Sequence, residues 1–131
     1  MSAMQRNKGA TFERRVAKEL GLLLGVSLRR NLRQTQESGL GDLVTDDAAW
    51  PFSVECKHAN TAKHPEWRRQ TVASAEADGK IPCLIWRITG SPSIRASLPM
   101  SVIGGPEGEW FDMDLEGFAY MAREIMAGGW T

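Results

Sequence analysis

The chain has 131 residues, of which 42% are hydrophobic and 24% are charged, a composition typical of a folded globular domain. No apolar run approaches about 20 residues, which argues against a membrane span, and the polar N-terminus is not expected to act as a secretory signal. The net charge is zero, but residues 1–70 hold 12 Lys and Arg against 8 Asp and Glu. This basic excess suits a protein that binds nucleic acid, and ordinary variation of surface charge explains it equally well.

The first predicted element is a helix with an apolar stripe, from about Ala10 to Leu24, and Gly25 is placed to end it. Glu13 lies at the edge of this stripe, where a carboxylate is costly unless a group outside the helix uses it. A strand that contains several arginines is expected from about Ser27 to Gln36.

Two further strands flank a turn signal and predict an antiparallel hairpin, a short strand at residues 42–44 and a longer one at residues 52–58. Successive side chains of a strand point to opposite faces. Cys56 is therefore expected to face the core, while Glu55 and Lys57 share the other face.

Asp42 begins the shorter strand and would lie across from Glu55 and Lys57 if the register allows it. Carboxylate oxygens suit a hard cation such as Mg²⁺, and a lysine beside such an ion can orient a water molecule. This combination can cleave a phosphodiester with the help of a metal ion. The plainer alternatives are that Asp42 caps a glycine-rich turn and that Lys57 forms a surface salt bridge with Glu55.

A second helix is expected between Pro65, which suits a first turn, and Gly79, which suits a helix end. The nearly apolar run at residues 81–88 then predicts a strand that is buried on both faces. Cys56 and Cys83 both lie in apolar runs, and we expect two buried thiols rather than a disulfide.

The rest of the chain gives weaker signals, a strand at 98–103, a brief strand at 110–111 and a last helix capped by Asp114. The order helix, three strands, helix, strand predicts an α/β fold around a mixed sheet flanked by helices. We expect a single domain over the whole chain, with a core at about 8–88 and a strand and helix appendage at about 89–131.

With these residues in view, the chain resembles the PD-(D/E)XK nuclease superfamily, and within it the small Holliday-junction-resolvase-like and phage recombination nucleases. The resemblance covers roughly Lys8 to Ile88 and implies the restriction-endonuclease-like core, whose element order is the one given above. Glycine stands at position 41 where the family name has proline. The positions that match the family pattern are Glu13, Asp42, Glu55, Lys57 and, in the helix after the lysine, Gln70.

The resemblance implies a Mg²⁺-dependent DNA endonuclease, in which Mn²⁺ can substitute, acting on branched recombination intermediates such as four-way junctions. Asp42, Glu55 and the Cys56 backbone carbonyl are expected to hold the metal, and Glu13 to support it directly or through water. Lys57 is expected to orient and help deprotonate the attacking water or to stabilise charge on the phosphorane, and Gln70 to hold the water or a phosphate. A homodimer in the cytoplasm of a bacterial or phage-infected cell is expected.

Basic side chains in the same half of the chain suit a DNA track, although each one alone could be an ordinary surface charge. The candidate phosphate contacts are Arg14, Arg29, Arg30, Arg33, Lys63, Arg68 and Arg69. His58 and His64 have no spacing typical of metal ligands, and we expect them to be structural or to face the substrate. Two alternatives remain open, a restriction-like or end-processing nuclease on duplex or single-stranded DNA, and a DNA-binding module without activity.

Overall fold

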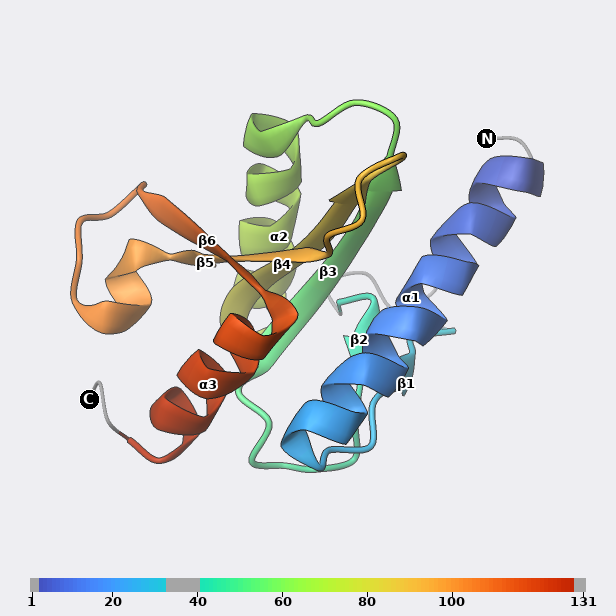
Figure 1. Ribbon diagram of the computed structural model, residues 1–131. Coiled ribbons are helices and arrows are strands. Elements are labelled where there is room, and N and C mark those ends of the chain that lie inside the picture. Colours follow the sequence, from blue (N-terminus) through green and yellow to red (C-terminus); the bar gives the residue numbers. More distant parts are fainter. Residues whose placement is uncertain (1–2, 33–40, 129–131) are drawn as a thin grey trace.

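The structure, a computed structural model, describes residues 3–32 and 41–128. Figure 1 shows the helices around a twisted sheet. The helices are α1 (Ala3–Leu24), α2 (His64–Asp78), the short 3-10 helix η1 (Met100–Ile103) and α3 (Leu115–Met126). The strands are β1 (Arg29–Arg30), β2 (Leu43–Val44), β3 (Phe52–Ala59), β4 (Ile81–Ile88), β5 (Arg95–Pro99) and β6 (Trp110–Asp114).

Within the described residues, the six strands form one sheet in the order β1-β2-β3-β4-β5-β6. Neighbouring strands are antiparallel except β3 and β4, which are parallel and pair along their whole length from Phe52 opposite Ile81 to Ala59 opposite Ile88. Helices α1 and α3 lie on one face of this sheet and α2 on the other (Figure 1). The predicted mixed sheet flanked by helices is confirmed, as is the β2–β3 hairpin, in which Leu43 pairs with Val54.

Helix α2 is the crossover that a parallel pair of strands needs, because such strands cannot be joined by a tight turn. Pro65 lies in its first turn, as predicted. Gly79 ends the helix in the left-handed region at φ 69°, where glycine pays no steric penalty, and its N–H bonds back to the helix. The chain therefore turns sharply into β4 beside β3, and α2 is laid across both strands.

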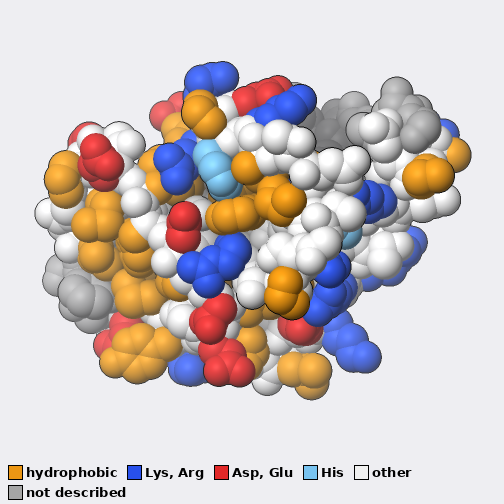
Figure 2. All heavy atoms as spheres, turned by 45° about the horizontal axis from the view of Figure 1, so that its top comes forward, with side chains coloured by type: hydrophobic (Ala, Val, Ile, Leu, Met, Phe, Trp, Pro, Cys, Tyr) orange, Lys and Arg blue, Asp and Glu red, His pale blue; other side chains and the backbone are white. Residues whose placement is uncertain are grey.

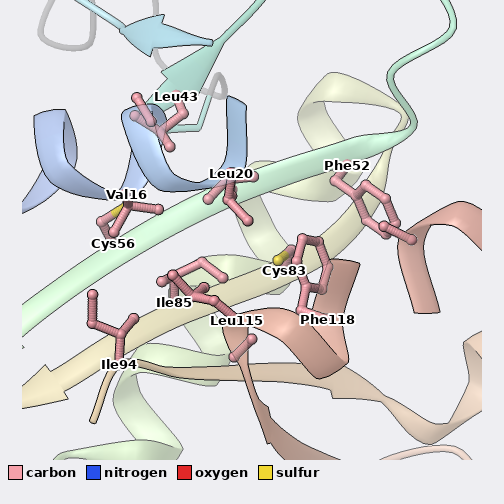
Figure 3. Close-up of a cluster of buried hydrophobic side chains, with 14 of the residues drawn as sticks. Val16, Leu20, Leu43, Phe52, Cys56, Cys83, Ile85, Ile94, Leu115 and Phe118 are labelled. Carbon is pink, nitrogen blue, oxygen red and sulfur yellow. The ribbon is translucent and has the colours of Figure 1, made fainter. Parts of the chain in front are cut away.

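The main core lies between the sheet and the helices α1 and α3 (Figure 3). Val16 and Leu20 of α1, Ile85 of β4 and Phe118 of α3 are all fully buried there. Cys56 faces this core, as predicted. Cys56 and Cys83 are both free thiols, and burial raises the pKa of each.

Three sequence predictions need correction. Helix α1 begins at Ala3 rather than near Ala10, because its first two turns bury almost no apolar surface and leave no stripe in the sequence. The strand predicted at residues 98–103 is wrong. The chain there ends β5 at Pro99 and coils into η1, and the strand instead occupies the mixed-polarity run from Arg95. Of the strand expected at 27–36, only Arg29–Arg30 is a strand within the described residues.

The segment after Ile88 continues the same sheet rather than standing apart from it. Strands β5 and β6 extend the sheet beyond β4, and Leu115 and Phe118 of α3 join the main core. Asp114 caps α3 as predicted, since its carboxylate accepts a 2.7 Å hydrogen bond from the N–H of Gly117. None of the helices in the described part of the chain is long and apolar enough to cross a membrane.

Candidate active site

Asp42 lies just before β2 and is held against β3 by two hydrogen bonds. Its backbone N–H donates to the carbonyl of Val54 at 2.7 Å, and its Oδ2 accepts a 2.8 Å hydrogen bond from the backbone N–H of Cys56. The residue is only 4% exposed. The carboxylate is therefore fixed at the side of β3, one residue from Glu55.

Glu55 is 6% exposed, and its carboxyl group makes side-chain hydrogen bonds with Asp42 and with Ser74 of α2. The pKa of Glu55 is raised to about 8, mainly by burial and then by the charge of Asp42, while the hydrogen bond from Ser74 and the charge of Lys57 oppose the rise. The hairpin thus brings Asp42 beside Glu55, and the burial of Glu55, together with the nearby charge of Asp42, accounts for its raised pKa.

Glu13 reaches the same corner from α1 but has a partner of its own. Its Oε1 lies 2.8 Å from Nε of Arg30, and both side chains are largely covered. Burial raises the pKa of Glu13, the hydrogen bond from Arg30 opposes this rise, and the charge of Asp42 adds to it. Arg30, predicted as a phosphate contact, is in this structure the ion-pair partner of Glu13.

One cleft of about 710 Å³ joins these groups. Glu13, Asp42, Glu55 and Lys57 all line it, and the first turns of α1 form one of its walls with Gln5, Arg6, Gly9 and Ala10. Lys8, close to this wall, donates to Oδ1 of Asn60 at 3.1 Å and ties α1 to the end of β3. The cleft therefore exists because α1 extends well past the part of it that packs on the core.

A second, basic groove of about 510 Å³ lies next to this cleft, between α1 and β1. Arg14, Lys18 and Arg29 line it, and Arg30 lines both hollows. Arg29 also lies 3.0 Å from Asp46 in an exposed pair. Figure 2 shows several Lys and Arg side chains gathered on the right-hand side of the view, the side on which α1 lies in Figure 1.

The remaining predicted site residues lie elsewhere. Gln70 is exposed on α2, one turn before Ser74, and is not part of the lining of the cleft. Lys63 and Arg69 are also exposed on or next to α2, and Arg68 lies over the ring of Trp110 at 5.6 Å. Arg33 lies outside the described residues.

The two histidines make packing contacts. The His58 ring lies 5.3 Å from the ring of Phe12, and its pKa is lowered, mainly by burial and then by nearby Lys and Arg charges. The His64 ring packs edge-on against Trp67 and Trp86, with ring centres 5.6 and 4.5 Å away. The sequence predicts that both residues are structural or face the substrate; His64 packs among tryptophans, and His58 both packs on Phe12 and borders the cleft.

Within residues 3–32 and 41–128, no group of three or more His, Cys, Asp or Glu side chains is arranged to hold a metal ion. Glu13 points to Arg30, which leaves Asp42 and Glu55 as the acidic pair. This pair nevertheless fits a divalent cation. Two buried carboxyl groups in contact repel each other when both are charged, and carboxylate oxygens are the ligands that Mg²⁺ prefers.

Three residues at the site were not found from the sequence. Ser74 bonds Glu55 from α2, Arg6 lines the cleft from the unexpected first turns of α1, and the buried Asn31 bonds the chain next to Asp42. The position of Ser74, one turn after Gln70 in a helix expected to cover the strand, is a signal that could have found it. No pattern in the sequence marks the other two.

A mixed sheet with this strand order, helices on both faces and an Asp, a Glu and a Lys at one corner define the protein as a nuclease of the PD-(D/E)XK class. A model of the family described as "Phage putative PDDEXK endonuclease" matches residues 4–98. The chain belongs to this family of phage PD-(D/E)XK endonucleases.

The fold is also that of a solved resolvase. Hjc of Archaeoglobus fulgidus, a Holliday junction resolvase from an archaeal hyperthermophile, superposes with a TM-score of 0.53 at 20% sequence identity. The match covers 88% of this chain and 96% of that one. No curated protein matches the chain in sequence. The resemblance to PD-(D/E)XK nucleases is therefore confirmed in family, and the fold matches that of a Holliday junction resolvase.

Proposed function

We propose that the protein is a Mg²⁺-dependent endodeoxyribonuclease that hydrolyses phosphodiester bonds in branched recombination intermediates, with Mn²⁺ able to substitute. The observation that carries this proposal is the contact between the carboxyl groups of Asp42 and Glu55 in a cleft that Lys57 also lines. Two acids buried in contact cannot both ionise at low cost unless a cation lies between them, so the pair stabilises the fold least where no cation is bound.

Each residue at the site has a task that its position allows. Asp42, Glu55 and the backbone carbonyl of Cys56 would hold the metal ion, which when bound supplies positive charge to polarise the phosphate and acidify a water molecule. Lys57 would orient that water or balance the negative charge that develops on the phosphorane. Glu13 would support the metal through water, since its carboxylate is engaged with Arg30.

The basic groove supports a DNA substrate that passes beside the cleft. Arg14, Lys18 and Arg29 present their charges along α1 and β1, and phosphate contacts of this kind supply much of the affinity for DNA. The choice of a branched substrate rests on the fold that the chain shares with Hjc. A four-way junction has two symmetric strands to cut, so we propose a homodimer that presents two clefts.

A substrate panel tests this function directly. Four-way junction, duplex and single-stranded DNA of the same sequence are incubated with Mg²⁺ or Mn²⁺, with Glu55→Ala as the inactive control. Preferential cleavage of the junction by the wild-type chain supports the proposal, and light scattering in solution checks for the dimer. Equal cleavage of duplex or single-stranded DNA would show that the branched junction is not the preferred substrate. No cleavage of any DNA with either ion would refute the nuclease function.

A further inference from the structure

Asn31, which directly follows β1, is a buried polar residue that the proposed chemistry does not use. It is only 7% exposed. Its backbone N–H donates a 2.8 Å hydrogen bond to the carbonyl of Asp42, and its side-chain Nδ2 donates a 3.0 Å hydrogen bond to the carbonyl of Gly41. One residue thus holds two consecutive carbonyl groups on either side of the Cα of Asp42.

The peptide group between Gly41 and Asp42 is also held from the opposite side, by β3. The N–H of Asp42 belongs to the peptide group whose oxygen Asn31 binds, and it donates to the carbonyl of Val54 at 2.7 Å. Both polar atoms of this peptide group are therefore fixed by neighbouring chain segments. A planar peptide with both ends held cannot rotate, so it sets the direction in which the Asp42 side chain leaves the backbone.

Gly41 lets the chain come close enough to β3 for these bonds to form. A Cβ at this position would lie 2.7 Å from the carbonyl oxygen and 2.9 Å from the nitrogen of Val54, both of them backbone atoms of a central strand. Those atoms cannot move without opening the hairpin. The glycine at a position where the family name has proline is thus required by close approach, and Asn31 fixes the segment that this approach creates.

We propose that Asn31 is a positioning residue for Asp42, and that its side-chain amide, together with the close approach at Gly41, holds the Asp42 carboxylate beside Glu55 so that the two can share a divalent cation. The inference rests on the proposed function, because it assigns the pair to metal binding. Loss of a group that orients a metal ligand usually lowers metal affinity by about 10- to 100-fold.

The test measures Mn²⁺ affinity by calorimetry together with the thermal unfolding midpoint. Asn31→Leu keeps the size of the side chain and removes the amide donor, and Asn31→Gln keeps an amide. Thr71→Val is the matched control, since the buried hydroxyl of Thr71 donates a 2.7 Å hydrogen bond to the carbonyl of Trp67 within α2 and Thr71 does not line the cleft.

We expect Asn31→Leu to weaken Mn²⁺ binding by about tenfold or more, Asn31→Gln to recover part of this loss, and Thr71→Val to lower the unfolding midpoint while leaving Mn²⁺ affinity within about twofold. In the cleavage assay the loss for Asn31→Leu should appear in the Mn²⁺ concentration needed and not in the KM for DNA. If Asn31→Leu does not fold, Asn31→Ser takes its place with the same expectation.

The outcomes separate the two proposals. Wild-type Mn²⁺ affinity in folded Asn31→Leu or Asn31→Ser would overturn the positioning role and leave the nuclease function standing. A wild-type chain that binds Mn²⁺ but cuts no DNA would refute the function alone, and the affinities would still decide the role of Asn31. A wild-type chain that binds no Mn²⁺ would overturn both.

Discussion

The backbone N–H of Cys56 donates a 2.8 Å hydrogen bond to the Asp42 carboxylate. This bond joins the middle residue of the Glu-X-Lys element to the acid of the preceding turn. The two parts of the motif are therefore held together by a backbone N–H and do not depend on the Cys56 side chain. The Cys56 side chain meanwhile packs into the core between β3 and α1. The middle residue therefore contributes through its backbone, and its side chain anchors the strand.

Asp42→Asn should abolish most of the activity without harming the fold. The amide oxygen can still accept the bond from Cys56, but the charge that opposes ionisation of Glu55 is gone, so the unfolding midpoint in metal-free buffer should rise slightly. Cleavage should fall by about 10²- to 10³-fold, the loss typical when one charge-stabilising group is removed. Thermal unfolding and single-turnover cleavage check both expectations. Full activity in this variant would remove Asp42 from the metal site.

The raised pKa of Glu55 predicts a pH dependence of stability in metal-free buffer. The unfolded chain loses this proton near pH 4.5 and the folded chain near pH 8, so between these values the folded state binds more protons than the unfolded state. The free energy of unfolding should therefore fall as the pH rises from about 4.5 to about 8, by at most about 1.4 kcal/mol per pH unit, and then level off.

Glu55→Gln provides the control for that titration, because glutamine fills the same space and does not ionise. Chemical denaturation at several pH values should show a flatter profile for this variant than for the wild-type chain. Adding Mg²⁺ should stabilise the wild-type chain most at the alkaline end, where Glu55 is ionised. Parallel pH profiles for the two proteins would show that Glu55 is not the group that titrates.

Arg30→Gln should destabilise the protein, because the largely covered charge of Glu13 is balanced by Arg30. Removing Arg30 leaves the largely covered Glu13 carboxylate without its 2.8 Å ion pair, which should cost about 1–3 kcal/mol at neutral pH. The double variant Glu13→Gln with Arg30→Gln should regain part of this loss, because no unpaired charge remains. Denaturation of the single and double variants measures the coupling, and additive losses would contradict it.

Substitutions in the basic groove should weaken DNA binding without changing the chemistry. Arg14→Gln and Lys18→Gln should each lower affinity for every DNA in the panel and reduce the slope of log affinity against log salt by about one. The rate of cleavage at saturating DNA should stay close to that of the wild-type chain. The exposed Arg69→Gln serves as a comparison on α2. An affinity that does not respond to salt would refute the groove as a phosphate track.

Lys57→Arg tests whether the site needs a compact ammonium group. Arginine keeps the charge but is longer and planar, so it cannot take the same position relative to a bound water. We expect cleavage to be lost while DNA and Mn²⁺ binding persist, as filter binding and calorimetry would report. Retained cleavage would reduce Lys57 to a general source of positive charge.

Much of the fold could be predicted because its signals are local. Alternation in β3 and the turn before it place Asp42 beside Glu55, Pro65 and Gly79 bound α2, and Asp114 caps α3. The helix ends and the cap depend on neighbours within a few residues, and the hairpin joins two strands that are adjacent in the chain. The sequence predicts the pairing of the two acids on the condition that the strand register allows it, and the family resemblance adds the expectation about their roles.

What could not be predicted depends on contacts between distant elements. Arg30 pairs with Glu13 across 17 positions, and Ser74 meets Glu55 only because α2 crosses β3 at one particular angle. Gln70 matched the family pattern, yet it lies exposed on α2. Its direction could not be predicted, because one polar residue does not define how a helix is rotated about its axis. The first turns of α1 gave no signal because they bury so little apolar surface.

The crossover through α2 also determines when the site matures during synthesis. The β2–β3 hairpin is complete once residue 59 has been made, so Asp42 and Glu55 can meet early, but they do so in water and with ordinary acidity. Glu55 becomes covered only when α2, which carries Ser74, and the parallel strand β4 have been made and have packed against β3. Unfinished chains and proteolytic fragments that stop before α2 therefore contain every acid of the motif but not the layer that buries Glu55, and the site is complete only after β4 has been made.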